Sequence, residues 1–195
     1  MKKILFLLFA VLPILGYAQQ EHMTFKGVPI NGKLTDMVTK LEKAGFYDSY
    51  KADECHYALR GTFTGESCDI FITATPKTKT VCSVMVSYKQ EYNSWSTLKS
   101  KYIDLRDAFK AKYGEPISDN KSFKYPYTEG DGHEITAIAV GKCDYSCVFK
   151  SEDKGYVVLY IGKGGSGANI LLLYSDNINS KLQDQEDKAN VMNDI

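Results

Sequence analysis

The sequence has no excess of charge of either sign, because 24 lysine and arginine residues stand against 24 aspartate and glutamate residues. Proteins that hold nucleic acid or anionic membrane surfaces electrostatically need a basic surplus to neutralise phosphates. The even balance excludes both classes of protein. With 44% hydrophobic and 12% aromatic residues, the chain instead has the composition of a globular domain with one sizeable core.

Beyond residue 18 the chain lacks any run of about 20 apolar residues, the length that a membrane-spanning helix requires. The one long apolar run, ILFLLFAVLPIL, follows two lysines and precedes the small residues of Gly-Tyr-Ala. This order predicts a secretory signal peptide over residues 1–18, cleaved before Gln19, against the alternative of a retained anchor helix. Since no cysteine follows the apolar core, a lipoprotein is not expected. We expect a periplasmic or secreted protein.

Catalytic patterns are also missing. His56 neighbours Cys55, but adjacent residues of a strand point to opposite faces, so the two cannot form a nucleophile–base pair. His133 and Glu134 lack the second histidine of HExxH, and residues 135–138 are typical of a strand where that motif needs a helix. No Gly-x-Ser-x-Gly elbow exists. The sequence therefore predicts a protein that is not an enzyme and that takes no cofactor.

Five cysteines follow the predicted signal, and an odd count leaves at least one free thiol. Cys143 and Cys147 bracket three residues that favour a tight hairpin loop, which can bring the two sulfurs together in a disulfide. The other three alternate in phase with apolar neighbours, so buried thiols are as well supported as bridges. A lone CxxxC spacing is neither a zinc pattern nor the CxxC redox pattern, so no metal site is expected.

Two segments have the apolar spacing of amphipathic helices: residues 34–44, ended by Gly45, and residues 94–113, ended by Gly114 and Pro116. Segments typical of strands are residues 55–64, 67–75, 80–89, 122–127, 134–143, 145–150, 155–161 and 169–174. Short connections between them imply antiparallel pairing.

The order of these elements predicts an α+β fold. It consists of two tandem helix-plus-antiparallel-meander units, with the helices packed on one face of the sheet. We expect a single domain over residues 19–175, with halves of about 25–90 and 91–175. Residues 176–195 are expected to form a polar C-terminal helix or tail.

A glycine-rich loop matches the literal pattern GxGxxG. It consists of Gly162, Lys163, Gly164, Gly165, Ser166 and Gly167. Binding a pyrophosphate would need a helix after this loop, yet residues 168–174 are typical of a strand. The segment therefore predicts a flexible hairpin connection and a candidate contact loop, because glycine permits close backbone approach.

Tyrosines in predicted loops or turns are the best candidates for recognition, since they give contact area at low entropic cost. Our first candidates are Tyr125, Tyr127 and Tyr145, with ordinary half-buried packing as the alternative.

The densest acidic loop covers residues 129–134, and it matches no defined calcium-loop spacing. Two interpretations of this loop remain: a solvated turn and a site of weak cation binding. Asp131, His133 and Glu134 form the one local cluster that a hydrolase of cell-wall or sugar material could use.

The segments WSTLKSKYIDLRDAFKAKYGEP and LLLYSDNIN, with the signal ending at Ala18-Gln19, resemble small secreted proteins of Bacteroides-type bacteria. This resemblance implies a Gram-negative periplasm or exterior. The plan of a helix followed by antiparallel strands, used twice, is similar to β-lactamase-inhibitor-like domains. Those domains bind proteins rather than catalyse a reaction.

The sequence therefore predicts an exported, non-catalytic binding module for an unknown protein or an envelope glycan, through one broad surface on the open sheet face. The alternatives are an envelope hydrolase and a structural or assembly factor of the envelope.

Overall fold

The computed structural model describes residues 21–194, so the predicted signal peptide and its cleavage site lie outside the described residues. The helices of this part are α1 (Leu34–Lys43), α2 (Trp95–Tyr113), α3 (Glu134–Ala139) and α4 (Asn177–Asp194). The strands are β1 (Thr24–Phe25), β2 (Val28–Pro29), β3 (Tyr47–Lys51), β4 (His56–Phe63), β5 (Glu66–Ala74), β6 (Val81–Tyr88), β7 (Ser118–Phe123), β8 (Cys143–Ser151), β9 (Gly155–Lys163) and β10 (Ala168–Asp176). The predicted α+β class with antiparallel strands is confirmed.

Eight strands form one continuous antiparallel sheet in the order β3-β4-β5-β6-β10-β9-β8-β7, beside a small β1-β2 pair. The two groups of strands meet where β6 pairs with β10, for example at Val84 and Tyr174. Backbone hydrogen bonds therefore run unbroken across the boundary between the expected halves. The prediction of two tandem units is wrong in this respect, because the meanders merge into a single sheet.

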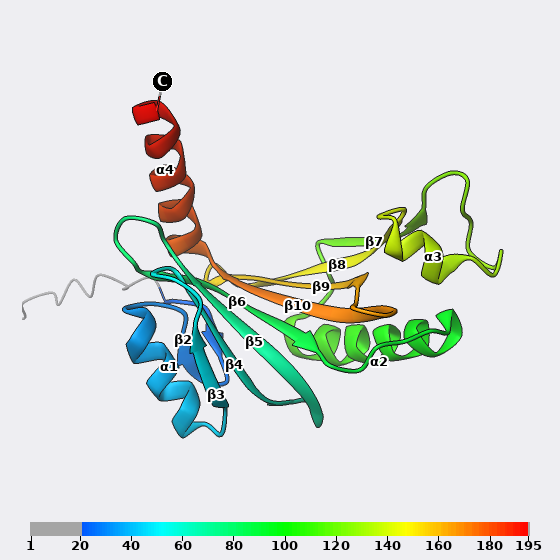
Figure 1. The fold of residues 1–195 in the computed structure, drawn as a ribbon, viewed down its shortest axis with the longest axis horizontal. Coiled ribbons are helices and arrows are strands. Elements are labelled where there is room, and N and C mark those ends of the chain that lie inside the picture. Colours follow the sequence, from blue (N-terminus) through cyan, green and yellow to red (C-terminus); the bar gives the residue numbers. More distant parts are fainter. Residues whose placement is uncertain (1–20, 195) are drawn as a thin grey trace, which may run out of the picture.

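One face of this sheet packs against α1 and α2 (Figure 1). The buried side chains of the two helices recur at helical spacing: Leu34, Met37, Val38 and Leu41 in α1, and Leu98, Tyr102, Leu105 and Phe109 in α2. Both apolar stripes are those that the sequence predicts. The strands contribute every second residue to the same core, as in β9, where Val157, Leu159 and Ile161 are buried.

The C-terminal helix α4 stands on the opposite side of the sheet from α1 and α2, which corrects the expectation that all helices share one face (Figure 1). The hydroxyl of Ser180 lies 2.7 Å from that of Ser175, whose strand neighbours Tyr174 and Asp176 are buried. Farther along α4, the Glu186 carboxylate accepts a hydrogen bond from the Lys77 amide at 2.5 Å. The predicted tail is thus a helix fixed to the β5–β6 turn.

Residues 134–143 do not form the predicted strand. Residues 134–139 form the short helix α3, and β8 begins at Cys143. Alternating apolar residues over so short a segment fit both periods. Just before α3, the Asp131 carboxylate accepts the His133 amide at 2.7 Å, a local bond that fixes the turn leading into the helix.

The hairpin expected between Cys143 and Cys147 is also absent. Both residues lie on the continuous strand β8, four positions apart, which separates them by about 13 Å at the usual rise of a strand. Their thiols are free, so the predicted disulfide is wrong. Among residues 21–194, no helix combines the length and apolar character needed to cross a membrane.

Candidate functional site

The glycine-rich loop is held by a carboxylate from the segment that connects β6 to α2. The amides of Gly165 and Ser166 and the Ser166 hydroxyl all donate to Glu91, the last two at 2.8 and 2.5 Å. These donors lower the pKa of the Glu91 carboxyl, the Ser166 hydroxyl contributing most. The backbone of the loop thus binds a carboxylate of the chain itself.

One glycine of this loop is required by close packing. A Cβ on Gly167 would lie 2.7 Å from the Tyr92 carbonyl oxygen, so any side chain there would push the loop away from the backbone of residue 92. A Cβ on Gly164 would lie 2.7 Å from a Glu91 carboxylate oxygen and would displace the Glu91 side chain. The glycine-rich loop, predicted to be a flexible connection, is therefore held in place by its hydrogen bonds to Glu91. Its other side, with Lys163, faces α3 across a groove of about 280 Å³.

Tyr145 does not lie in a loop. It is 2% exposed, points from β8 into the core, and makes edge-to-face contacts with Trp95 and Tyr102. Its hydroxyl donates to Glu129 at 2.5 Å. Burial, followed by this bond to a carboxylate, raises the pKa of Tyr145. Tyr145 is thus a core residue, and its selection as a surface contact is wrong.

The Glu129 carboxylate ties the loop of residues 124–133 to the body of the protein. It also accepts hydrogen bonds from the Trp95 indole at 3.3 Å and from the Lys99 ammonium. Within this loop, Tyr125 is 91% exposed and Tyr127 is half-buried. Of the three tyrosine candidates, Tyr125 alone is presented fully to solvent.

The acidic loop uses its carboxylates on its own backbone. Asp131 accepts the amides of Thr128 and His133 at 2.8 and 2.7 Å, and Glu134 accepts the Gly130 amide at 2.7 Å. These bonds stabilise the turn of the acidic loop that precedes α3. Over residues 21–194, no group of three or more His, Cys, Asp or Glu side chains is arranged to hold a metal ion.

A further feature is the sheet face that points away from α1 and α2, here called the open face, which α4 borders at one end. Successive cross-strand partners form one apolar row across six strands: Ala58, Phe71, Met85, Leu173, Val158 and Val148. Phe71 is 38% exposed and the other five are half-buried. On the edge strand β3, Tyr50 pairs with Ala58, is 66% exposed and extends the row.

Charged groups border this row. Asp69 lies 3.1 Å from Lys89 and 3.8 Å from Arg60, and Arg60 lies 3.2 Å from Asp48. An apolar centre with a charged margin is the usual anatomy of a protein interface, in which aromatic residues, methionine and arginine are enriched.

The sequence predicts binding through the open face, and it also contains a signal for the apolar residues of that face, which the choice of loop tyrosines does not use. A strand with one solvated face alternates apolar and polar residues, whereas β5 contains Ile70-Phe71-Ile72 and β10 contains Ile170-Leu171-Leu172-Leu173. Such continuous apolar runs place apolar side chains on both faces. The Glu91 clamp, in contrast, has no local sequence signal, because its partners lie about 75 residues away.

Comparisons of the chain with protein families, with curated proteins and with solved structures give no match.

Proposed function

We propose that this protein is an exported, non-catalytic binding module that recognises a protein partner through the open face of its sheet. The carrying observation is the apolar row that crosses six strands, with an exposed aromatic side chain at Phe71 within it and another at Tyr50 on the neighbouring edge strand. A contiguous apolar patch on a soluble domain marks an interaction surface. The signal-like sequence of residues 1–18 supports a periplasmic or secreted location.

The shape of this surface favours a macromolecule over a small ligand. The row lies along a broad sheet rather than in a concave cavity, so it offers area without enclosure. Helix α4 borders the face at the end where Ser175 meets Ser180. A partner that presents apolar and aromatic side chains, surrounded by charges opposite to those of Arg60 and Asp69, fits this arrangement.

Photo-crosslinking tests the proposal directly. A photoreactive phenylalanine analogue at position 71 is expected to give one discrete adduct with a second protein in an envelope extract of the expressing cells. The same analogue at Val140, which is 56% exposed at the end of α3, serves as the control and should give none. No adduct at position 71, equal adducts at both positions, or an adduct of two copies of this chain would each contradict the proposal.

The affinity for the captured partner is then measured by titration for a matched pair of variants. Val148→Asp places a charge in the apolar row, whereas Val140→Asp places the same charge elsewhere on the surface. Val148→Asp should weaken binding at least about tenfold, equivalent to about 1.4 kcal/mol. Val140→Asp should bind like the unmodified protein. Equal affinities for the two variants would place the contact elsewhere.

A further inference from the structure

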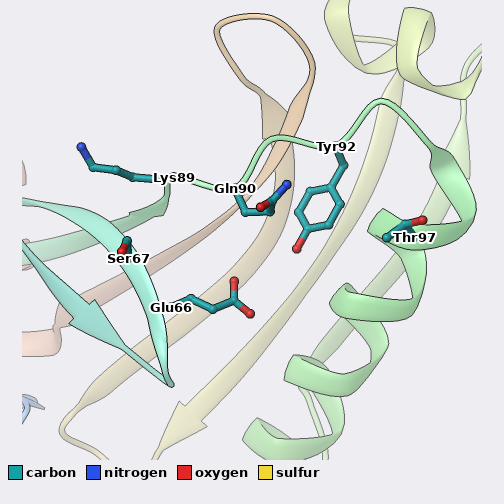
Figure 2. A pocket seen from close by; sticks show the side chains of 6 residues that line it. All are labelled: Glu66, Ser67, Lys89, Gln90, Tyr92 and Thr97. Carbon is teal, nitrogen blue, oxygen red and sulfur yellow. The ribbon is translucent and has the colours of Figure 1, made fainter.

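A second feature lies at the junction between β5, β6 and α2, next to the charged border of the open face. A cavity of about 550 Å³ opens there to solvent, within the size range of small-ligand sites. Its lining residues are Glu66, Ser67, Lys89, Gln90, Tyr92 and Thr97. Figure 2 shows the side chains of Glu66, Gln90 and Tyr92 converging on one space, while that of Lys89 extends away from it.

The charges around this cavity are already compensated. Glu66 forms an ion pair with Lys101 of α2, and Lys89 lies 3.1 Å from Asp69. An ionic ligand would have to compete with these pairs. The remaining polar groups are the hydroxyls of Ser67 and Thr97 and the amide of Gln90, which are neutral donors and acceptors. The lining therefore suits an uncharged ligand with many hydrogen-bonding groups.

Tyr92 supplies an aromatic surface in this polar setting. The ring is half-buried, and burial followed by the nearby Glu66 carboxylate raises the pKa of its phenol. The hydroxyl therefore stays protonated at neutral pH and can donate a hydrogen bond. A half-exposed ring offers its face to the C–H groups of a ligand, while polar neighbours meet its hydroxyls.

The wall that carries Tyr92 is rigidly held. The Tyr92 amide donates to the Ala168 carbonyl at 2.7 Å, and the Ala168 amide donates to the Tyr92 carbonyl at 3.0 Å. Next to Tyr92, the Glu91 carboxylate accepts hydrogen bonds from Ser166 of the glycine-rich loop. Gln90 Nε2 donates to the Glu91 carbonyl at 2.8 Å, which orients the amide at the rim. A preformed wall of this kind reduces the entropic cost of binding.

We infer that this cavity binds a neutral saccharide unit, with the Tyr92 ring against the C–H face of the sugar and Glu66 and Gln90 bonded to its hydroxyls. This inference is independent of the proposed protein-binding face, because the cavity contains no residue of the apolar row and shares only Lys89 with its charged border. A glycan that carries such a unit would be its natural source.

Nuclear magnetic resonance titration of the processed chain tests this inference. The probes are the trisaccharides of N-acetylglucosamine, glucose, mannose and xylose, each added to about 10 mM, roughly ten times a millimolar dissociation constant. At least one is expected to cause saturable shifts in the amides of Glu66, Ser67, Tyr92 and Thr97. If no probe shifts these amides in a saturable way, the inference is wrong.

Variants then locate the contact. Tyr92→Ala should abolish the shifts, and Glu66→Gln should weaken binding about tenfold, a change typical of losing one charged hydrogen bond. Gln90→Ala, at an exposed position, tests the same site if Tyr92→Ala fails to fold. Tyr125→Ala and Val140→Asp are the controls, and both should bind the sugar unchanged. Unchanged binding by Glu66→Gln and Gln90→Ala together would overturn the inference, and it would leave the open face untouched.

Discussion

Glu91 and Ser166 lie 75 positions apart in the sequence, yet the Ser166 amide and hydroxyl both donate to the same Glu91 carboxylate oxygen, at 2.8 and 2.5 Å. The Gly165 amide donates to the other oxygen. One side chain thus accepts three hydrogen bonds from the glycine-rich loop. It also joins this loop to the segment that carries Tyr92.

Replacing Glu91 by alanine should release the loop. The amides of Gly165 and Ser166 would then lose their acceptor, and we expect their hydrogen exchange to accelerate at least about tenfold. Glu115→Ala is a suitable control, because Glu115 makes a surface ion pair with Lys110 at 2.8 Å and has 77% of its side chain exposed. Equal exchange in both variants would show that the glycines hold their conformation without Glu91.

The hydrogen bonds to Glu91 also predict that the conformation of the glycine-rich loop depends on pH. The Ser166 hydroxyl, with the Ser166 and Gly165 amides, lowers the pKa of Glu91 from its usual 4.5. A carboxyl whose pKa is lowered in the folded state stabilises that state above its unfolded pKa, and the effect is lost as pH falls through the folded pKa. The loop should therefore stay intact at pH 5 and loosen below about pH 4.5.

The amide chemical shifts of Gly165 and Ser166 measure this directly. They should titrate with a midpoint below 4.5, and Glu91→Gln, which cannot ionise, should abolish the titration. A midpoint at or above 4.5 in the unmodified protein would mean that the clamp does not favour the carboxylate.

Tyr145 should prove to be a stability residue rather than a contact residue. It is 2% exposed and packs against Trp95, Tyr102 and Phe123. Tyr145→Ala should destabilise the fold by about 3–5 kcal/mol in urea denaturation, as expected for emptying an aromatic site. Tyr145→Phe removes the bond to Glu129 alone and should cost about 1–2 kcal/mol. Tyr125→Ala, at a 91% exposed position, should change stability by less than about 0.5 kcal/mol.

How far the sequence predicts this fold is clear from α2 and α3. The stripe from Leu98 to Phe109 repeats over several turns, so one period fits it and the helix is predicted correctly. Helix α3 has six residues, too few for its period to be distinguished from that of a strand. Pairing of β6 with β10 is decided by contacts between residues about 90 positions apart, which no local pattern encodes.

The residues of the candidate site are also hard to predict, because they too are brought together by contacts between distant parts of the sequence. The hairpin expected in this segment puts Tyr145 in its turn, between Asp144 and Ser146. In β8, however, they are the alternate residues of a strand whose Tyr145 side is buried. The apolar row could be recognised only after the strand registers had aligned Met85 with Leu173 and Leu173 with Val158. Surface chemistry built from neighbouring strands depends on register, and register is a property of the whole sheet.

Tyr102 offers a case in which a mutation should stabilise the protein. Its side chain is fully buried in the core, and its hydroxyl has no hydrogen-bond partner. Tyr102→Phe removes the unsatisfied hydroxyl, leaves the ring in place, and should raise the free energy of unfolding by about 1 kcal/mol in urea denaturation. A loss of stability would instead reveal a bond from this hydroxyl, for which the nearby Cys147 thiol is the candidate.

The cysteines provide a test of chain topology through their chemistry. With Cys143 and Cys147 four residues apart on one strand, all five thiols should be alkylated in denaturant without reductant, as measured by intact mass.

Under native conditions the order of reaction should follow exposure and thiolate content. Burial raises the pKa values of Cys68, Cys82 and Cys143 to about 11, which leaves little thiolate at neutral pH. Cys55 is partly exposed, with the Lys79 ammonium 3.2 Å from its sulfur, and should be labelled first. Cys55→Ser should therefore remove the fast phase. Incorporation of only three labels in denaturant would instead indicate a disulfide. If peptide mapping placed it between Cys143 and Cys147, β8 would need a different course, because the thiols of one extended strand cannot be brought within bonding distance.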